Sequence, residues 1–105
     1  MTDAYKDLTV VQLDRALGVL LGTAAGDALG AGYEFATPPQ HGQSVEMIGG
    51  GLGDFEPGEW TDDTAMAIAI AEIAASGTDL RNETALDALV KRWREWACNA
   101  KDIGV

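Results

Sequence analysis

The chain has 105 residues, of which 47% are apolar, and its formal net charge is −10. A chain of this size fits one domain with a modest core, and its apolar content excludes a compositionally disordered protein. The excess of acidic residues disfavours nucleic acid and anionic membrane as partners. The sequence also lacks a signal-peptide layout and any apolar stretch long enough to span a bilayer, so we expect a cytoplasmic protein.

The first predicted helix begins with a capping box. Thr9 precedes Gln12 by three residues, a spacing at which the two side chains can satisfy each other's backbone N–H groups. We expect the helix to run from about Val10 into Ala28. Its core-facing stripe, at helical spacing, comprises Leu13, Leu17, Leu20, Leu21 and Ala24.

Glycine recurs at every fourth position of this helix, at 18, 22, 26 and 30. Each glycine costs the helix roughly 1 kcal/mol relative to alanine, so four on one face require an explanation. One explanation is close packing of another helix along a groove without side chains. The other is the close approach of a ligand or loop to that groove, and the two are compatible.

A long glycine-rich loop follows, from Gly30 to Glu59, and loops of this length are more often functional than ordinary. Helix is predicted again from Thr61 to Ala75, ending at Ser76-Gly77, and its apolar residues lie on nearly every face. A third helix is predicted after the cap residue Asn82. Its predicted inner side is formed by Leu86, Leu89, Val90, Trp93 and Trp96.

No strand pattern of any length occurs, so the predicted fold class is all-α, with the long loop between the first two main helices. A helix that is apolar all round needs partners on all sides. Two amphipathic helices and a loop supply too few. We therefore expect further helices, either after Val105 or from another chain.

The turn Thr61-Asp62-Asp63 allows two interpretations. In the first, Thr61 caps the helix and the two aspartates occupy its first turn, where the helix dipole favours negative charge. In the second, three adjacent oxygen donors hold a cation, and oxygen-only ligands suit Mg²⁺ or Mn²⁺ rather than zinc. Three ligands from one turn cannot complete such a site, so other carboxylates must contribute.

Glu34 is the best candidate within the chain for a further carboxylate, because the glycine-rich end of the first helix can turn sharply before it. The alternative is a solvent-exposed loop glutamate. For Asp27, a buried hydrogen-bonding group at the end of the helix is favoured over a metal ligand. His41, the only histidine, is expected to be solvated rather than catalytic.

Two motifs in order carry a family resemblance. They are Leu17-Gly-Val-Leu-Leu-Gly-Thr-Ala-Ala-Gly-Asp-Ala-Leu-Gly30, followed by Glu34-Phe35, and then Gly58-x-Trp60-Thr-Asp-Asp-Thr64. Together with Asp102-Ile-Gly104 they resemble the ADP-ribosylglycohydrolase family, which includes the dinitrogenase reductase-activating glycohydrolases. The resemblance covers the chain from about Leu13 onward, and the order and spacing of the two motifs make it specific.

The resemblance implies an all-α hydrolase with a centre of two Mg²⁺ or Mn²⁺ ions. It implies that Thr61, Asp62 and Asp63 are metal ligands and that Glu34 positions or activates water. Asp102 and Gly104 correspond to a segment that borders the ADP-ribose. The implied reaction removes ADP-ribosylation, by hydrolysing the N- or O-glycosidic bond between ADP-ribose and a protein side chain or a small conjugate.

Members of the family are about twice this length or more, and a later Asp-x-Asp-Thr-like segment supplies their remaining metal ligands. We therefore interpret residues 1–105 as the amino-terminal part of a single domain, whose carboxy-terminal part or a complementing chain is missing. The fragment alone is expected to be inactive. The alternative function is a non-enzymatic ADP-ribose-binding or structural relative built on the same scaffold.

Overall fold

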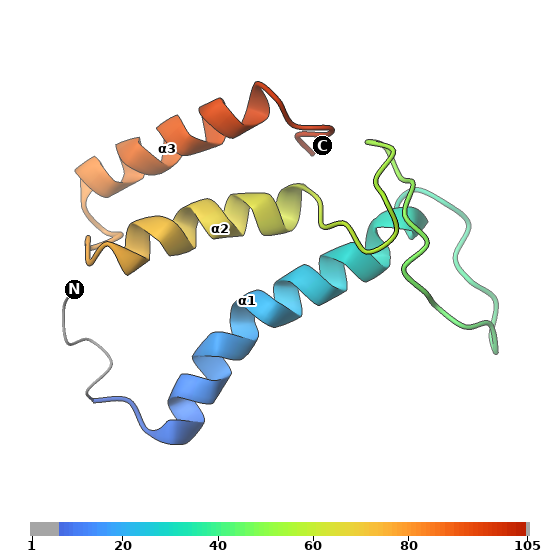
Figure 1. Ribbon diagram of the computed structural model, residues 1–105, viewed down its shortest axis with the longest axis horizontal. Coiled ribbons are helices and arrows are strands. Elements are labelled where there is room, and N and C mark those ends of the chain that lie inside the picture. The colour runs from blue at the N-terminus through green and yellow to red at the C-terminus, as the bar shows by residue number, and fades with distance from the viewer. Residues whose placement is uncertain (1–6, 105) are drawn as a thin grey trace.

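The computed structural model describes residues 7–104, and their fold is all-α. Its helices are α1 (Val10–Gly30), the short 3₁₀ helix η1 (Ala31–Tyr33), α2 (Asp62–Ala75) and α3 (Glu83–Ala97). No strand occurs between residues 7 and 104, where the only pairing of this kind is an isolated antiparallel bridge between Gly50 and Phe55. Helix α2 lies between α1 and α3 and contacts both, so the three main helices form one flat layer (Figure 1).

The predicted helix boundaries are confirmed closely. Thr9 and Gln12 form the capping box at the start of α1, with N···O distances of 2.9 and 3.1 Å. Asn82 occupies the cap position of α3, although its side chain makes no capping hydrogen bond. Helix α2 ends at Ala75, directly before Ser76-Gly77, where Gly77 has the left-handed φ of 84° that suits glycine.

The core of the layer lies between α2 and α3. Its buried side chains are Ala69 and Ile73 from α2 and Ala85 and Leu89 from α3, and the half-buried Trp93 packs against them. The Trp93 indole N–H also donates to the Met66 carbonyl oxygen at 3.2 Å. Since the α3 residues are spaced four apart, they form the stripe that faces α2.

The predicted inner side of α3 is therefore only partly right. Leu89 and Trp93 face α2, but Leu86 and Val90 are 47% and 49% exposed. Each of these two follows a stripe residue by one position. A step of one residue turns the helix by about 100°, which carries the side chain off the contact face.

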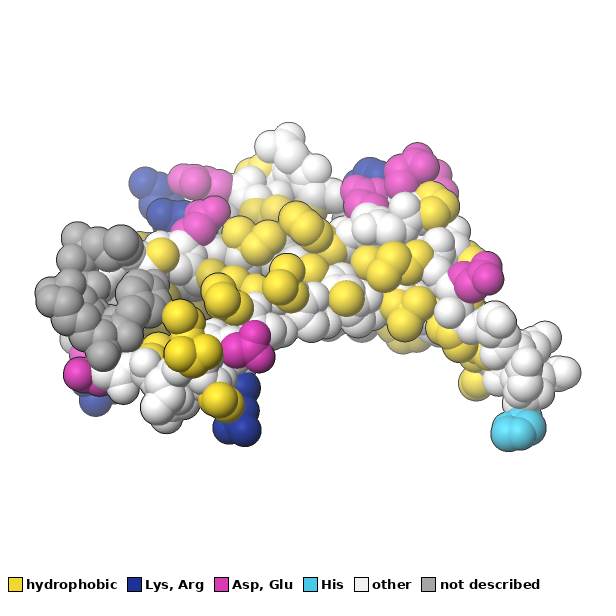
Figure 2. All heavy atoms as spheres, turned by 60° about the horizontal axis from the view of Figure 1, so that its bottom comes forward, with side chains coloured by type: hydrophobic (Ala, Val, Ile, Leu, Met, Phe, Trp, Pro, Cys, Tyr) yellow, Lys and Arg dark blue, Asp and Glu magenta, His cyan; other side chains and the backbone are white. Residues whose placement is uncertain are grey.

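The predicted core-facing stripe of α1 does not enter a core within residues 7–104. Leu17 is 62% exposed and Leu21 is 72% exposed. The face shown in Figure 2, with the lower edge of Figure 1 turned forward, carries hydrophobic side chains along most of its length. No helix of residues 7–104 is both long and apolar enough to cross a membrane.

Candidate active site

Asp27, near the end of α1, holds the beginning of α2. Its Oδ2 accepts hydrogen bonds from the backbone N–H of Thr61 at 2.8 Å and of Thr64 at 3.1 Å. Both threonine hydroxyls also donate to this carboxylate, Thr61 to Oδ1 at 2.5 Å and Thr64 to Oδ2 at 2.6 Å. The prediction of a hydrogen-bonding helix-end group is confirmed, and the half-buried Asp27 joins α1 to α2.

Thr61 occupies the predicted cap position of α2, but its side chain does not act as the cap. No hydrogen bond from the helix reaches the Thr61 hydroxyl oxygen, and the N–H group of Thr64 donates to the Asp27 carboxylate instead. Thr61 and Thr64 are 4% and 2% exposed. Asp62 and Asp63 stand in the first turn of α2, as predicted, with Asp63 the more exposed of the two.

A groove runs along the glycine face of α1 to the acidic turn. It has a volume of about 460 Å³ and is lined by Gly22, Thr23, Gly26, Asp27, Gly30, Glu34 and Asp63. A Cβ atom added to Gly22, Gly26 or Gly30 would meet nothing within 4 Å. Among residues 7–104, therefore, no helix packs on the glycine face, and the groove is open beside Glu34 and Asp63.

Glu34 follows η1 and has an exposed side chain, yet it lies within the field of the acidic turn. Partial burial and then the charges of Asp62, Asp63, Asp27 and Asp102 raise its pKa. Partial burial, together with the charges of Asp62 and Asp27, raises the pKa of Asp63 in the same way. The fold thus collects carboxylates from three distant parts of the sequence into one acidic cluster.

Asp27 differs from its acidic neighbours. Burial alone would raise the pKa of Asp27, but the hydrogen bonds from Thr61 and Thr64 outweigh burial and hold that pKa below its ordinary value. A carboxylate that accepts several N–H and O–H bonds is stabilised in its charged form. Asp27 therefore stays ionised within the cluster.

The segment Lys101–Gly104 closes the other side of the turn. Gly104 has a left-handed φ of 88°, and a Cβ atom there would overlap Oδ2 of Asp62. The Gly104 N–H donates to Oδ1 of the half-buried Asp102 at 3.3 Å. Asp62 and Asp102 line one hollow of about 290 Å³ together with Trp60 and Trp96.

An ion pair fixes this segment to the loop before α2. The Lys101 ammonium lies 2.7 Å from Oε1 of Glu59, and it also stands 5.6 Å from the centre of the Phe55 ring. Phe55 is buried and its backbone pairs with Gly50. The glycine-rich loop, the start of α2 and the end of the chain are thus joined around Asp62.

The acidic turn fits a hard cation in donor type but does not form a complete coordination shell. Thr61, Asp62 and Asp63 offer oxygen donors only, which suits Mg²⁺ or Mn²⁺. No group of three or more His, Cys, Asp or Glu side chains in residues 7–104 is spaced to hold a metal ion. Any such ion would need further ligands beyond those that this part of the chain supplies.

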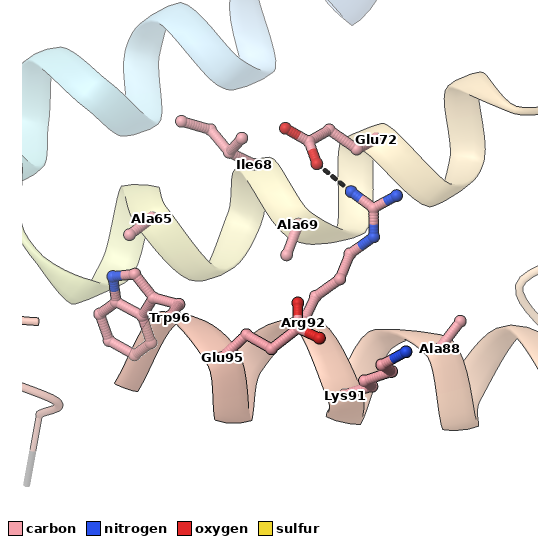
Figure 3. Close-up of a pocket in the computed structure, with 9 residues that line it drawn as sticks. All are labelled: Ala65, Ile68, Ala69, Glu72, Ala88, Lys91, Arg92, Glu95 and Trp96. Atoms are coloured by element: carbon pink, nitrogen blue, oxygen red, sulfur yellow. Dashed lines mark hydrogen bonds and ion pairs between the residues drawn. The ribbon is translucent and has the colours of Figure 1, made fainter. Parts of the chain in front are cut away.

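A larger groove, of about 610 Å³, lies between α2 and α3 (Figure 3). Its walls carry the ion pair between Arg92 and Glu72, and Trp96 closes one end. None of the predicted site residues lines it. The chemistry predicted from the sequence therefore concentrates at the acidic cluster and not at this groove.

The comparison with protein families agrees with the geometry. The family model described as ADP-ribosylglycohydrolase matches residues 8–104. The chain belongs to the ADP-ribosylglycohydrolase family. The acidic cluster, the glycine face and the Lys101–Gly104 segment all fall within the matched residues.

The chain is also similar to part of several curated relatives. The chain is 44% identical over 82 residues to ADP-ribosylarginine hydrolase Tri1 of Pseudomonas putida (strain GB-1), covering 78% of this chain and 22% of the relative. It is 43% identical over 82 residues to Tri1 of Serratia proteamaculans (strain 568), with the same coverage. It is 50% identical over 70 residues to ADP-ribosyl-[dinitrogen reductase] glycohydrolase of Rhodospirillum rubrum, covering 62% of this chain and 24% of the relative. The chain thus spans about a fifth of the length of these relatives.

The sequence did not point to Thr64 or Lys101 as parts of the site. Thr64 was visible in the motif, but its burial and its bond to Asp27 depend on how α1 crosses the start of α2. The spacing Thr61-x-x-Thr64, which places both side chains on one side of a helical turn, was the available signal. The pairing of Lys101 with Glu59 spans 42 residues and has no local signal.

Proposed function

We propose that this chain provides the amino-terminal side of the active site of an enzyme that hydrolyses the bond between ADP-ribose and an acceptor. The observation that carries the proposal is that Glu34 and Asp63 line the open groove on the glycine face, in a chain of this family. Asp62 and Asp102 line the hollow on the other side of the acidic turn, and their charges also act on Glu34. Two Mg²⁺ or Mn²⁺ ions complete the proposed site, with Thr61, Asp62 and Asp63 among their ligands. Bound there, they would orient the ribose hydroxyls and lower the pKa of water.

Glu34 performs the proton transfer in this proposal. Cleavage of a glycosidic bond develops positive charge on the ribose, which nearby carboxylates stabilise. Glu34 lies on the loop side of the groove, where its carboxylate can orient an attacking water and accept a proton from it. The water oxygen bonds to the anomeric carbon as the bond to the acceptor breaks, and the leaving acceptor takes up a proton, so that ADP-ribose and the free acceptor are released. Partial burial and then the neighbouring carboxylates raise the pKa of Glu34, the direction that strengthens it as a base.

The glycine face and the segment Lys101–Gly104 bind the substrate in the same proposal. The backbone at Gly22, Gly26 and Gly30 leaves room for a ribose to approach the carboxylates. Asp102 and Gly104 border the other side, next to Asp62. Arginine is the first acceptor to test, because two of the similar relatives are named ADP-ribosylarginine hydrolases.

The test fuses the full chain to the carboxy-terminal part of the P. putida relative, in place of that relative's matching segment. We call this the fused protein. ADP-ribose release from an ADP-ribosylated arginine substrate is measured with Mg²⁺ and with Mn²⁺, for the fused protein and for the 105-residue chain alone. We expect turnover by the fused protein and none by the chain alone.

Glu34→Gln separates catalysis from folding. We expect it to lower kcat of the fused protein by roughly 10²–10⁴-fold, the usual size of a general base contribution. Its thermal stability should stay the same or rise, because the substitution removes a charge that its neighbours repel. The matched control is Glu46→Gln, on the same loop, which should keep full activity. A folded fused protein that binds ADP-ribose but never releases it from a substrate would favour the non-enzymatic alternative.

A further inference from the structure

One carboxylate of the acidic cluster, that of Asp27, is engaged by hydrogen bonds on both of its oxygens. The carboxylate of Asp27 accepts four hydrogen bonds from Thr61 and Thr64, with donor–acceptor distances between 2.5 and 3.1 Å. Three of these bonds reach Oδ2 and one reaches Oδ1, so Asp27 is less free to bind a metal ion than a carboxylate without such partners. Its contribution must therefore come through the residues that it holds.

The Thr61 hydroxyl has one proton and two possible acceptors. Asp27 Oδ1 lies 2.5 Å from the hydroxyl oxygen, and Asp62 Oδ1 lies 3.1 Å from it. The shorter contact is with Asp27. When the proton points to Asp27, the lone pairs of Thr61 and the Oδ1 atom of Asp62 both remain free to face a cation.

Loss of the Asp27 acceptor would change both neighbours together. The hydroxyl proton of Thr61 would turn to Asp62. It would then occupy one oxygen of the Asp62 carboxylate, and the lone pairs of the Thr61 hydroxyl would rotate with it. The backbone N–H groups of Thr61 and Thr64 would lose their cap at the same time. Both effects act on the first turn of α2, where Asp62 and Asp63 stand.

We propose that Asp27 is a positioning residue, which takes the hydroxyl proton of Thr61 and caps α2 so that Thr61, Asp62 and Asp63 present their oxygens outward. This inference rests on the proposed function, because the outward oxygens are those assigned to the cation. Thr64 provides the matched comparison. Its hydroxyl bonds to the same carboxylate but, like its backbone N–H, it reaches Oδ2 and not the oxygen that receives the Thr61 proton.

The experiment compares Asp27→Asn and Thr64→Val in the fused protein. The asparagine can accept with one oxygen only and places an N–H₂ group against the remaining donors, whereas the valine removes a single hydroxyl. Binding of Mn²⁺ is followed by electron paramagnetic resonance, and hydrogen exchange is followed at the amides of Thr61 and Thr64. Asp27→Asn should speed exchange at both amides, by at least roughly 10-fold at Thr61, whereas Thr64→Val leaves the Asp27 carboxylate in place and should not speed exchange at Thr61.

We expect Asp27→Asn to weaken Mn²⁺ binding by at least about 10-fold and Thr64→Val to change it by less than about 3-fold, a contrast that a cap bond alone would not give. Equal weakening in both variants, in proportion to lost stability, would overturn the inference. Unchanged exchange at Thr61 in Asp27→Asn would overturn it as well.

If Asp27→Asn does not fold, Asp27→Glu, which keeps the charge but displaces the carboxylate, is compared with Thr64→Val by the same criteria. If the unsubstituted fused protein binds no Mn²⁺, both the proposed function and the role of Asp27 toward the cation are overturned. The hydrogen-exchange data would still report whether Asp27 holds the first turn of α2.

Discussion

The two ends of α1 meet their surroundings in opposite ways. At the carboxyl end, Asp27 accepts four hydrogen bonds, and Ala28 and Ala31 are 4% and 3% exposed. At the amino end, Val10 and Leu17 are 85% and 62% exposed. The hydrogen-bonded junction between Asp27 and the start of α2 is complete within residues 7–104, whereas the apolar face of α1 has no covering partner there.

The difference shows which part of the site residues 7–104 complete among themselves and which part they leave open. The junction needs only α1, α2 and the loop between them, all of which lie in the matched residues. Leucine side chains on the outer face of a helix gain free energy only when something covers them. The curated relatives are four to five times longer than the segment they share with this chain, which leaves ample polypeptide for that role.

The largest effect is expected from the double substitution Leu17→Gln and Leu21→Gln. In the 105-residue chain both side chains are already exposed, so the free energy of unfolding should change by less than about 0.5 kcal/mol per residue. In the fused protein, where we expect both to be buried, the loss should be about 3–5 kcal/mol in total. Urea unfolding of both proteins measures the difference. Equal small losses in the two proteins would show that this face of α1 remains uncovered.

Much of the fold followed from the sequence because its signals are local. The capping box at Thr9, the stop at Ser76-Gly77 and the cap position at Asn82 are each set by a few neighbouring residues, and all three agree with the structure. The inner face of α3 was less predictable. Leu86 and Val90 are apolar and adjacent to the contact stripe, and only the direction from which α2 approaches excludes them.

The candidate site was predictable as a set of residues but not as an arrangement. Glu34, the acidic turn and Asp102 were identified through motif order, and the fold brings their charges together. That Asp27 would cap α2 in place of Thr61 could not be read from spacing, since the bond joins residues 34 positions apart. The roles of Thr61, Asp62 and Asp63 as metal ligands and of Glu34 as the catalytic base remain predictions.

The next largest effect concerns the side of the acidic turn opposite Asp27. Gly104→Ala forces a side chain into a left-handed backbone, at a cost of about 1–2 kcal/mol, and also pushes against Asp62. Gly42→Ala is the matched control, because Gly42 has the same φ of 88° and open space around it. Thermal unfolding should show a similar strain in both fused proteins, with an added loss for Gly104→Ala.

Binding of Mn²⁺ separates the two alanine variants further. Only Gly104→Ala should weaken it, by about 10-fold or more if Asp62 is displaced as a ligand, in line with losses seen when ligand orientation is disturbed. Identical Mn²⁺ affinity in the two variants would argue that the Lys101–Gly104 segment does not define the position of Asp62.

A smaller effect is expected for Gly22→Ala, on the stability of the 105-residue chain and on substrate binding by the fused protein. In the 105-residue chain the new methyl group meets nothing, so the substitution should stabilise the helix by up to about 1 kcal/mol. In the fused protein the same methyl group would enter the groove that we assign to the ribose. A raised KM with little change in thermal stability would support a ligand on the glycine face, and a clear loss of stability would instead indicate a packed helix.

The smallest effect is expected from the ion pair that ties Lys101 to Glu59 on the protein surface. The hydrogen bond from Lys101 lowers the pKa of Glu59. The ion pair therefore stabilises the fold at pH values above the ordinary glutamate pKa of about 4.3, and this contribution is lost as the pH falls through the lowered pKa. Glu59→Gln should therefore reduce stability at pH 7 and make no difference at a pH well below 4. Thermal unfolding of the fused protein across this range, in low and in high salt, measures the effect, and salt should diminish it. A Glu59→Gln penalty that persists in acid would mean that the Glu59 side chain acts through packing or its hydrogen bond to the Glu56 N–H, and not through the charge of Lys101.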